Sequence, residues 1–184
     1  MKRVEYSDQK LVQLFRDEHR KEEAFTLIVN KYKEKIYWHI RKLVILHDDT
    51  DDILQNVFVR IWKGLENFRE DSQLYTWVYR IATNEALTFL NSKKKRFFLP
   101  IVDYENQLAN SLESDAYFNG DEIQLKLQKA ILTLPEKQRL VFNMKYFDEM
   151  KYEDMSEILD TSVGALKASY HHATKKIEKF FETD

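Results

Sequence analysis

The last helical stretch of the chain, residues 162–180, gathers lysines and histidines on one side. Drawn as a helix at about 100° per residue, its apolar side carries Val163, Leu166, Tyr170, Ala173 and Ile177. Its other side carries Gly164, Ala168, His171, His172 and Lys175. Lysine and histidine can reach DNA phosphates or base edges, and small residues let a helix approach a surface closely. The pattern fits either a helix seated in a DNA major groove or an ordinary solvated face.

Metal binding and covalent catalysis are poorly supported by the sequence. His171 and His172 are adjacent, so their side chains point about 100° apart and cannot chelate one metal as an i, i+4 pair can. The chain has no cysteine, which excludes disulfides, thiolate zinc sites and cysteine nucleophiles. No phosphate-binding glycine loop, nucleophile constellation or metal-ligand cluster is evident in the sequence. We therefore expect no metal, no cofactor and no enzymatic activity.

The elements that position this cationic side are expected to be helices. The chain of 184 residues is 43% hydrophobic and 33% charged, with three glycines and two prolines. So few turn formers in a charged sequence favour long helices. The apolar runs are too short to cross a bilayer, and the first ten residues lack the apolar segment of a signal peptide. We expect a soluble, cytoplasmic, all-α protein.

Charge is distributed unevenly, although the net charge is only −2. Residues 93–96 form a basic run, whereas residues 101–122 contain six acids and no lysine or arginine. The small net charge is therefore a cancellation between segments, so it does not argue against a nucleic-acid partner.

Apolar periodicity predicts helices at residues 25–43, from about 50 to 65 and at 75–92. Thr50 is expected to cap the second of these, with Asp51 and Asp52 in its first turn. Helices are also expected over 123–134 and 135–147. Two more would be separated by a break at residues 160–161, with Ser162 capping the last, which is the plan of a helix-turn-helix.

These helices predict two small domains. Residues 1–96 would form an N-terminal helical domain, and residues 122–184 a C-terminal helix-turn-helix domain. Residues 97–121 are expected to be a flexible acidic linker, and a short helix within it stays open.

Two blocks of the sequence together resemble the extracytoplasmic-function (ECF) branch of bacterial RNA polymerase sigma factors. The first block is TDDILQNVFVRIWKGLENF followed by YTWVYRIATNEALTFL. The second is LTLPEKQRLVFNMKYFDEMKYEDMSEILDTSVGALKASYHHATKKI. The resemblance implies a protein that binds core RNA polymerase, recognises the −35 and −10 elements of promoter DNA and helps to melt it. It also implies an anti-sigma factor as a partner.

The resemblance assigns core-polymerase binding to the acidic start of the helix expected from about residue 50 to 65. The residues implied are Asp51, Asp52, Gln55 and Asn56, with Phe58 packing behind them. Carboxylates on an exposed helical turn can pair with arginines of a partner helix. Helix capping alone would explain the two aspartates, but it would not explain Gln55.

The resemblance assigns −10 recognition to a loop and the helix that follows it. The implied residues are Asn67, Phe68, Arg69, Ser72, Tyr75, Thr76, Trp77 and Arg80. Aromatic side chains can stack on bases, and a loop pocket can hold an extruded base. For Trp77 taken alone, a core role is favoured over base stacking, because large aromatic side chains are mostly buried. Arg80 and the basic run at 93–96 are expected to lie beside the DNA backbone.

Recognition of the −35 element is assigned to Lys167, Ala168, His171, His172 and Lys175. The sequence departs from the commoner family pattern at positions 165, 168, 169 and 172 of this helix, and at Thr88 and Asn91 earlier in the chain. These departures bear on which promoter is read. The acids of the linker fit either a solvated tether or a mimic of nucleic-acid phosphate.

Two other functions fit parts of the pattern. One is a conventional dimeric helix-turn-helix regulator with a helical N-terminal sensor domain, which would bind palindromic half-sites. The other is a helical adaptor without a role on DNA.

Overall fold

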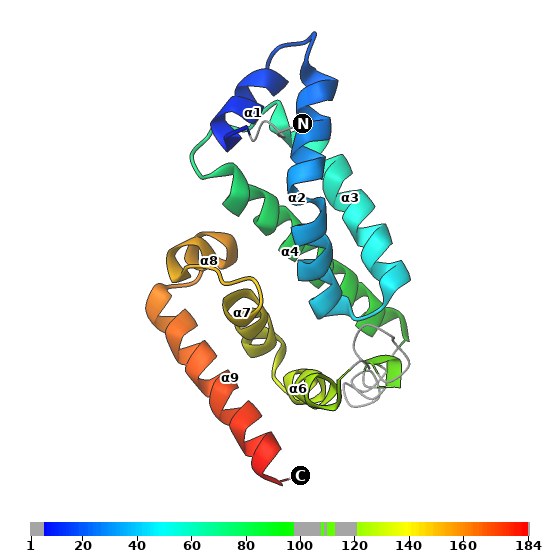
Figure 1. Ribbon diagram of the computed structural model, residues 1–184, viewed down its shortest axis with the longest axis vertical. Coiled ribbons are helices and arrows are strands. Elements are labelled where there is room, and N and C mark those ends of the chain that lie inside the picture. Colours follow the sequence, from blue (N-terminus) through cyan, green and yellow to red (C-terminus); the bar gives the residue numbers. More distant parts are fainter. Residues whose placement is uncertain (1–5, 98–107, 109, 113–120, 184) are drawn as a thin grey trace.

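The computed structural model describes residues 6–97, 108, 110–112 and 121–183, and over these ranges the chain is helical without a strand (Figure 1). The helices are α1 (Asp8–Phe15), α2 (Lys21–Val44), α3 (His47–Leu65), α4 (Leu74–Phe97), α6 (Glu122–Leu132), α7 (Glu136–Tyr146), α8 (Tyr152–Leu159) and α9 (Val163–Thr183). The predicted all-α class is therefore confirmed. No helix in the described ranges is both long and apolar enough to cross a membrane.

The N-terminal half is built from α1 to α4. Helices α2 and α3 form a hairpin, and α4 packs on both of them (Figure 1). Ile36, Val57 and Ala82, one from each of these helices, are fully buried between them. Their spacing follows the apolar period read from the sequence, because each helix turns one stripe toward the common core.

Helix α3 begins one turn earlier than predicted. Ile45 has φ 68° and ends α2, and α3 starts at His47 with Asp48 and Asp49 in its first turn. Thr50 is fully buried, and its hydroxyl donates to the Leu46 carbonyl at 2.7 Å, so it does not cap the helix. The prediction that Thr50 caps α3 was therefore wrong. The chain turns sharply at Ile45, and this turn sets the start of α3. A turn of this kind has no apolar periodicity by which the sequence could have predicted it.

Helix α1 was not predicted from the sequence, and α4 extends further than its sequence pattern indicated. Ser7 caps α1, since its hydroxyl accepts the amide N–H of Lys10 at 3.2 Å. Helix α4 runs on to Phe97, so the basic run at 93–96 lies on this helix instead of after it. Lys93 pairs with Asp49 at 2.5 Å, which ties the end of α4 to the start of α3.

The C-terminal half contains the predicted helix-turn-helix. Asp160 adopts a left-handed backbone, with φ 49° and ψ 49°, and ends α8. Ser162 then caps α9, because its hydroxyl accepts the amide N–H of Ala165 at 3.3 Å. Leu166 and Ile177 are buried as the period of α9 requires. This pair of helices therefore forms as the sequence indicated.

The two halves share a core. A small apolar cluster belongs to the C-terminal half alone and is made by Ala130, Ile131, Leu134, Phe142, Ala173 and Ile177. A larger cluster joins Met144, Met155 and Ile158 to the core of the N-terminal half. We call the contact of α7 and α8 with α2 and α4 the seam. Of the predicted linker, residues 97, 108, 110–112 and 121 are described. Phe97 ends α4 and Asp121 caps α6, while residues 108 and 110–112 are helical, and Leu108 and Leu112 are buried in the larger cluster. The rest of the linker lies outside the described residues.

Candidate nucleic-acid and polymerase interfaces

Helix α9 presents its cationic face to solvent. All the side chains assigned to the −35 element are exposed, namely Lys167, Ala168, His171, His172 and Lys175. The rings of His171 and His172 lie 5.9 Å apart, centroid to centroid. The opposite side of the helix holds Leu166, Ala173 and Ile177 in the interior. The face is open to a partner along its whole length.

The acidic surface of α3 is also open. Asp51, Asp52, Gln55 and Asn56 are exposed, while Ile53 and Val57 between them are buried. Since the first turn of α3 holds Asp48 and Asp49, the pair at 51 and 52 lies in the second turn, where helix-dipole capping fades. Capping therefore does not account for this acidic surface.

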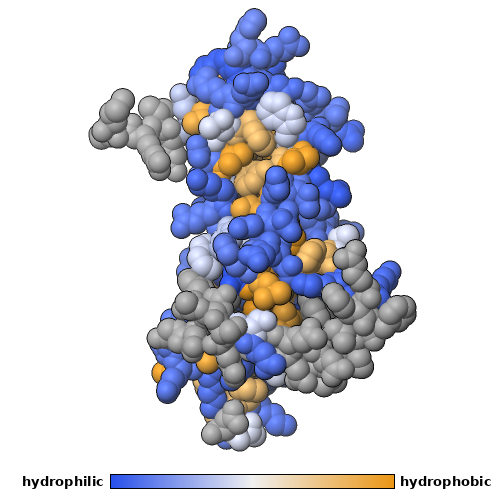
Figure 2. Space-filling model, turned by 90° about the vertical axis from the view of Figure 1, so that its right-hand side faces the viewer, coloured by the Kyte–Doolittle hydropathy of each residue, from blue (hydrophilic) through white to orange (hydrophobic). Residues whose placement is uncertain are grey.

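Apolar side chains support and flank the acidic surface of α3. Phe58 is half-buried and meets the edge of Phe25 at 6.5 Å between ring centroids. Val59, next to it, keeps 46% of its surface exposed. Figure 2 views the side of the molecule on which α3 lies in Figure 1, and apolar side chains form an interrupted strip there among hydrophilic ones. A partner docking on α3 would meet both charge and apolar surface.

The predicted −10 loop connects α3 to α4 and is held in place by its neighbours. Phe68 is 7% exposed, and its ring lies 4.9 Å from that of Trp77. Arg16 donates to the Phe68 carbonyl at 3.2 Å and pairs with Glu70 at 2.7 Å. A Cβ on Gly64 would lie 2.8 Å from the Trp77 ring. Trp77 therefore packs tightly against α3 and the loop.

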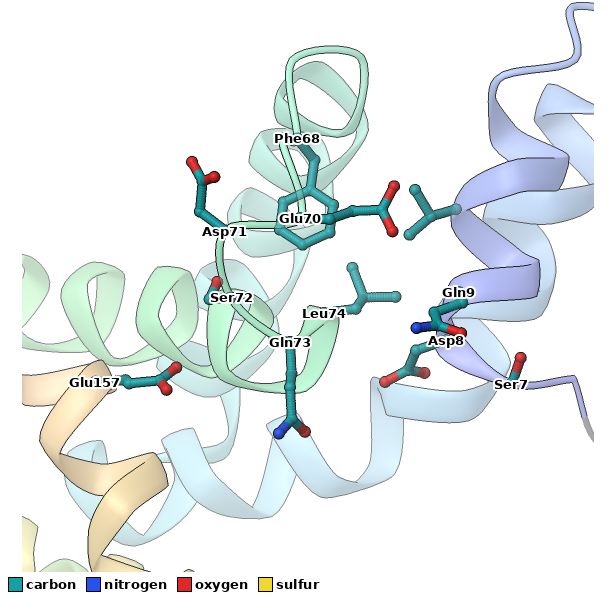
Figure 3. A pocket seen from close by; sticks show the side chains of 11 residues that line it. Ser7, Asp8, Gln9, Phe68, Glu70, Asp71, Ser72, Gln73, Leu74 and Glu157 are labelled. Carbon is teal, nitrogen blue, oxygen red and sulfur yellow. The ribbon is translucent and has the colours of Figure 1, made fainter.

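A pocket of about 630 Å³ opens beside this loop (Figure 3). Its walls come from the start of α1, the loop and Glu157 of α8. The charged side chains among its lining residues are all carboxylates, namely Asp8, Glu70, Asp71 and Glu157. Of the predicted −10 residues, Phe68 and Ser72 line the pocket. Asn67 and Arg69 are exposed outside it, and Arg69 lies 3.8 Å from Asp71.

The start of α4 faces the C-terminal half. Arg80 donates to the Glu157 carbonyl of α8 at 2.6 Å. Thr76 is fully buried, and its hydroxyl donates to the Gln73 carbonyl at 2.9 Å. Burial, followed by the charges of Asp148 and Asp154, raises the pKa of Tyr75 to about 12. In this arrangement α8 covers part of the surface that the sequence assigned to DNA.

Comparison with known proteins identifies the family. Residues 28–96 match Sigma-70 region 2, and residues 124–177 match Sigma-70 region 4. RNA polymerase sigma-H factor of Pseudomonas aeruginosa is 31% identical over 182 residues, which covers 94% of this chain and 92% of that protein. The ECF RNA polymerase sigma factor SigW of Bacillus subtilis is 30% identical over 166 residues, covering 86% of this chain and 89% of that protein. The chain belongs to the ECF family of sigma factors.

As a sigma factor, the protein directs promoter-specific transcription initiation, and the match to region 2 disfavours the dimeric regulator. The fold agrees with this assignment. The sigma factor RpoE of Bartonella quintana, solved with the anti-sigma factor NepR, has a TM-score of 0.66 at 17% identity. The similarity covers 87% of this chain and 98% of RpoE.

The predicted site residues of this sigma factor fall on three surfaces. The sets on α3 and α9 are exposed, apart from the supporting Phe58, whereas the −10 set is divided between the pocket, the Trp77 contact and the seam. Sequence reasoning missed Ser7, Asp8 and Gln9, which form the α1 wall of the pocket. The available signal was the capping serine just before the apolar residues Leu11 and Val12.

Proposed function

We propose that this chain docks on core RNA polymerase through α3 and reads the two promoter elements with separate domains. Region 4, residues 122–184, would bind the −35 element through the exposed face of α9. The N-terminal domain, residues 1–96, would bind the −10 element through the loop after α3 and the start of α4. Residues 97–121 would connect them.

The observation that carries this proposal is the pair of open surfaces of opposite charge on α3 and α9. Asp51, Asp52 and Gln55 lie together on α3, where arginines of a partner helix can reach them. Lys167 and His171 lie on the recognition helix, where phosphates and base edges can be reached. One chain thus has a surface for a protein partner and another for duplex DNA.

The remaining roles follow from the same assignment. The chain would do no covalent chemistry and need no cofactor, because promoter opening relies on binding energy. It would work in the cytoplasm, where the polymerase and the promoter are found. An anti-sigma factor would be a further partner, since RpoE of Bartonella quintana forms a complex with NepR.

Run-off transcription tests this function. Purified protein would be mixed with bacterial core RNA polymerase and genomic DNA fragments, and we expect discrete transcripts that core polymerase alone does not give. The double variant Asp52→Arg, Gln55→Ala should lose them, because it reverses a charge that faces the polymerase. Glu34→Arg, a charge reversal on an exposed position of α2, serves as the matched control and should keep them. Absence of transcripts, together with duplex binding by the protein alone, would instead favour a conventional regulator.

A further inference from the structure

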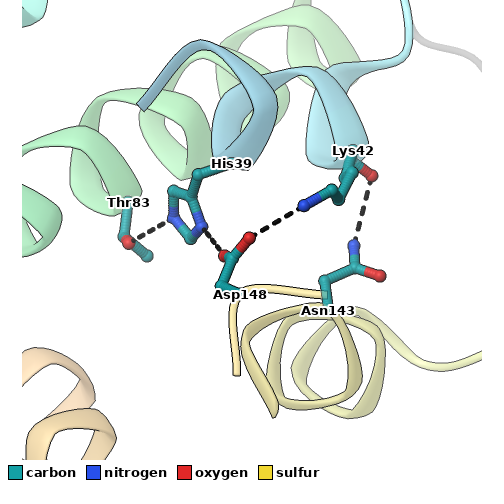
Figure 4. Close-up of polar contacts among 5 residues, drawn as sticks. All are labelled: His39, Lys42, Thr83, Asn143 and Asp148. Atoms are coloured by element: carbon teal, nitrogen blue, oxygen red, sulfur yellow. Dashed lines mark hydrogen bonds and ion pairs between the residues drawn. The ribbon is translucent and has the colours of Figure 1, made fainter. Parts of the chain in front are cut away.

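A buried polar cluster lies in the seam (Figure 4). Asp148, just after α7, accepts a hydrogen bond from Nδ1 of His39 at 2.7 Å and pairs with Nζ of Lys42 at 2.8 Å. Both partners lie on α2 of the other domain. His39 Nε2 lies 2.9 Å from the hydroxyl of Thr83 on α4, and Asn143 on α7 donates to the Lys42 carbonyl at 3.2 Å. One carboxylate therefore joins elements of both domains.

The cluster depends on Asp148 being charged. The side chains of His39, Asp148 and Lys42 are 0%, 6% and 13% exposed. Burial by itself would raise the pKa of Asp148, but hydrogen bonds and charge from His39 and Lys42 outweigh it and hold that pKa below its ordinary value. If the carboxylate were lost, the side chain of Lys42 would have no counter-ion in a largely dry site, and separation of the domains would rehydrate it.

The closed seam covers part of the surface proposed to read the −10 element. Arg80 donates to the Glu157 carbonyl of α8 at 2.6 Å, so one of its guanidinium donors is committed to α8 and the side chain is drawn toward that helix. Tyr75 and Tyr79, whose rings lie 4.7 Å apart, have pKa values raised first by burial and then by the charge of Asp148. The side of α4 that carries these three residues therefore faces the C-terminal domain.

Promoter geometry requires this contact to break. The two elements lie roughly 25 base pairs apart by name, which at 3.4 Å per pair is about 85 Å of DNA. Helix α9 is about 32 Å long, at 1.5 Å for each of its 21 residues. Helix α9 follows α8 directly, so when α8 touches α4 the two DNA-reading surfaces lie closer together than the two promoter elements. The closed form is therefore not the form that reads a promoter.

We propose that the Asp148–His39–Lys42 cluster is an autoinhibitory latch that holds the free protein closed and withholds the −10 surface of α4 until the domains part. This inference rests on the proposed function of the two domains. The occupant of the covered surface is then the chain's own region 4, and DNA and region 4 compete for Arg80. Opening by the polymerase would expose the −10 surface only where it can be used.

The first test measures domain separation in the free protein. Because the chain has no cysteine, Glu34→Cys and Glu178→Cys, both at exposed positions, give a clean pair of dye sites for single-molecule energy transfer. Asp148→Asn should raise the ratio of open to closed molecules by about tenfold or more, since breaking one side of a buried pair is costly. Glu149→Gln is the matched control, an exposed acid in the same loop, and it should leave the ratio unchanged.

A second variant guards against local unfolding of the loop. Lys42→Gln breaks the latch from the α2 side, and it should open the protein as Asp148→Asn does while circular dichroism keeps the helical signal. The double variant should open no further than the more open single variant, because Asp148→Asn already removes the ion pair that Lys42→Gln breaks. Unchanged energy transfer in both single variants would overturn the latch.

The functional test separates the latch from the sigma activity. The probe is a labelled single-stranded oligonucleotide with the −10 sequence of a promoter found by run-off transcription. Free Asp148→Asn protein should bind it about tenfold more tightly than the unaltered protein, in proportion to the open population. With saturating core polymerase, both proteins should give equal transcripts. Transcripts with equal oligonucleotide binding would overturn the latch alone, whereas no transcripts from the unaltered protein would overturn the proposed function.

Discussion

Helices α9 and α4 both carry residues assigned to DNA, but they present them in opposite ways. Lys167, His171 and Lys175 on α9 are exposed. On α4, Thr76 is fully buried and Arg80 is bound to α8. The recognition helix is ready to meet a duplex, whereas the start of α4 is engaged within the molecule. The comparison teaches that the two promoter contacts need not become available at the same moment.

The two regions also differ in what supports them. Of the buried residues of α9, Ala173 and Ile177 belong to the small cluster within its own half, whereas Leu166, near the start of the helix, belongs to the larger cluster. Helix α4 belongs to the larger cluster, which includes Met144 and Met155 from the other half. A change at the seam should therefore act first on the α4 surface, and it should leave intact the part of the α9 face that Ala173 and Ile177 support.

The largest expected effect is the loss of transcription when the exposed cationic face of α9 is changed. The double variant Lys167→Glu, His171→Glu places two carboxylates against DNA phosphates, and transcription should fall by about a hundredfold or more. Run-off assays measure this, with Lys137→Glu, at an exposed position of α7, as the control. Energy transfer should stay at the closed value, because neither residue lies in the seam. A variant that still transcribed normally would remove α9 from promoter recognition.

Next in size are two glycine substitutions that contrast a packed helix with an open one. In Gly64→Ala, the new Cβ would lie 2.8 Å from the Trp77 ring, and the free energy of unfolding should fall by about 1–3 kcal/mol. In Gly164→Ala, nothing lies within 4 Å of the Cβ, and the free energy of unfolding should rise by about 0.5 kcal/mol. Urea unfolding measures both. Equal effects of the same sign would show that the Trp77 contact is looser than its distances indicate.

The difference between the exposed α9 and the covered α4 also explains which features the sequence could predict. The two faces of α9 follow from its period of 3.6, and burial of Leu166 and Ile177 confirms them. The seam leaves no local signal, because His39 and Asp148 are 109 positions apart. Asp148 stands in a short loop after α7, where an acid is ordinarily solvated. The sequence of the loop and helix that carry the predicted −10 residues therefore could not show that α8 packs over the start of α4.

A smaller effect separates phosphate contacts from base contacts on α9. Lys175→Ala should weaken binding of polymerase holoenzyme to all promoters alike and reduce the slope of log affinity against log salt by about 1. His171→Ala should leave that slope nearly unchanged and alter the preference among −35 sequences. Filter binding at several salt concentrations gives both quantities. If Lys175→Ala changed the preference among sequences instead, Lys175 would have to be reassigned to the base edges.

The smallest expected effect is the loss of stability at low pH that the seam causes. The pKa of Asp148 is lowered in the closed protein, so the ionised carboxylate stabilises that form above the ordinary carboxyl pKa, about 3.9. This stabilisation is lost as pH falls from that value through the lowered one, because the open or unfolded chain then binds the proton more readily. Urea unfolding between pH 7 and pH 3 should show a steeper acid loss for the unaltered protein than for Asp148→Asn. Glu149→Gln should keep the steep loss, since its carboxylate is exposed. Parallel curves for all three proteins would mean that Asp148 gains nothing from His39 and Lys42, and the contrast between a latched α4 and a free α9 would then rest on apolar packing alone.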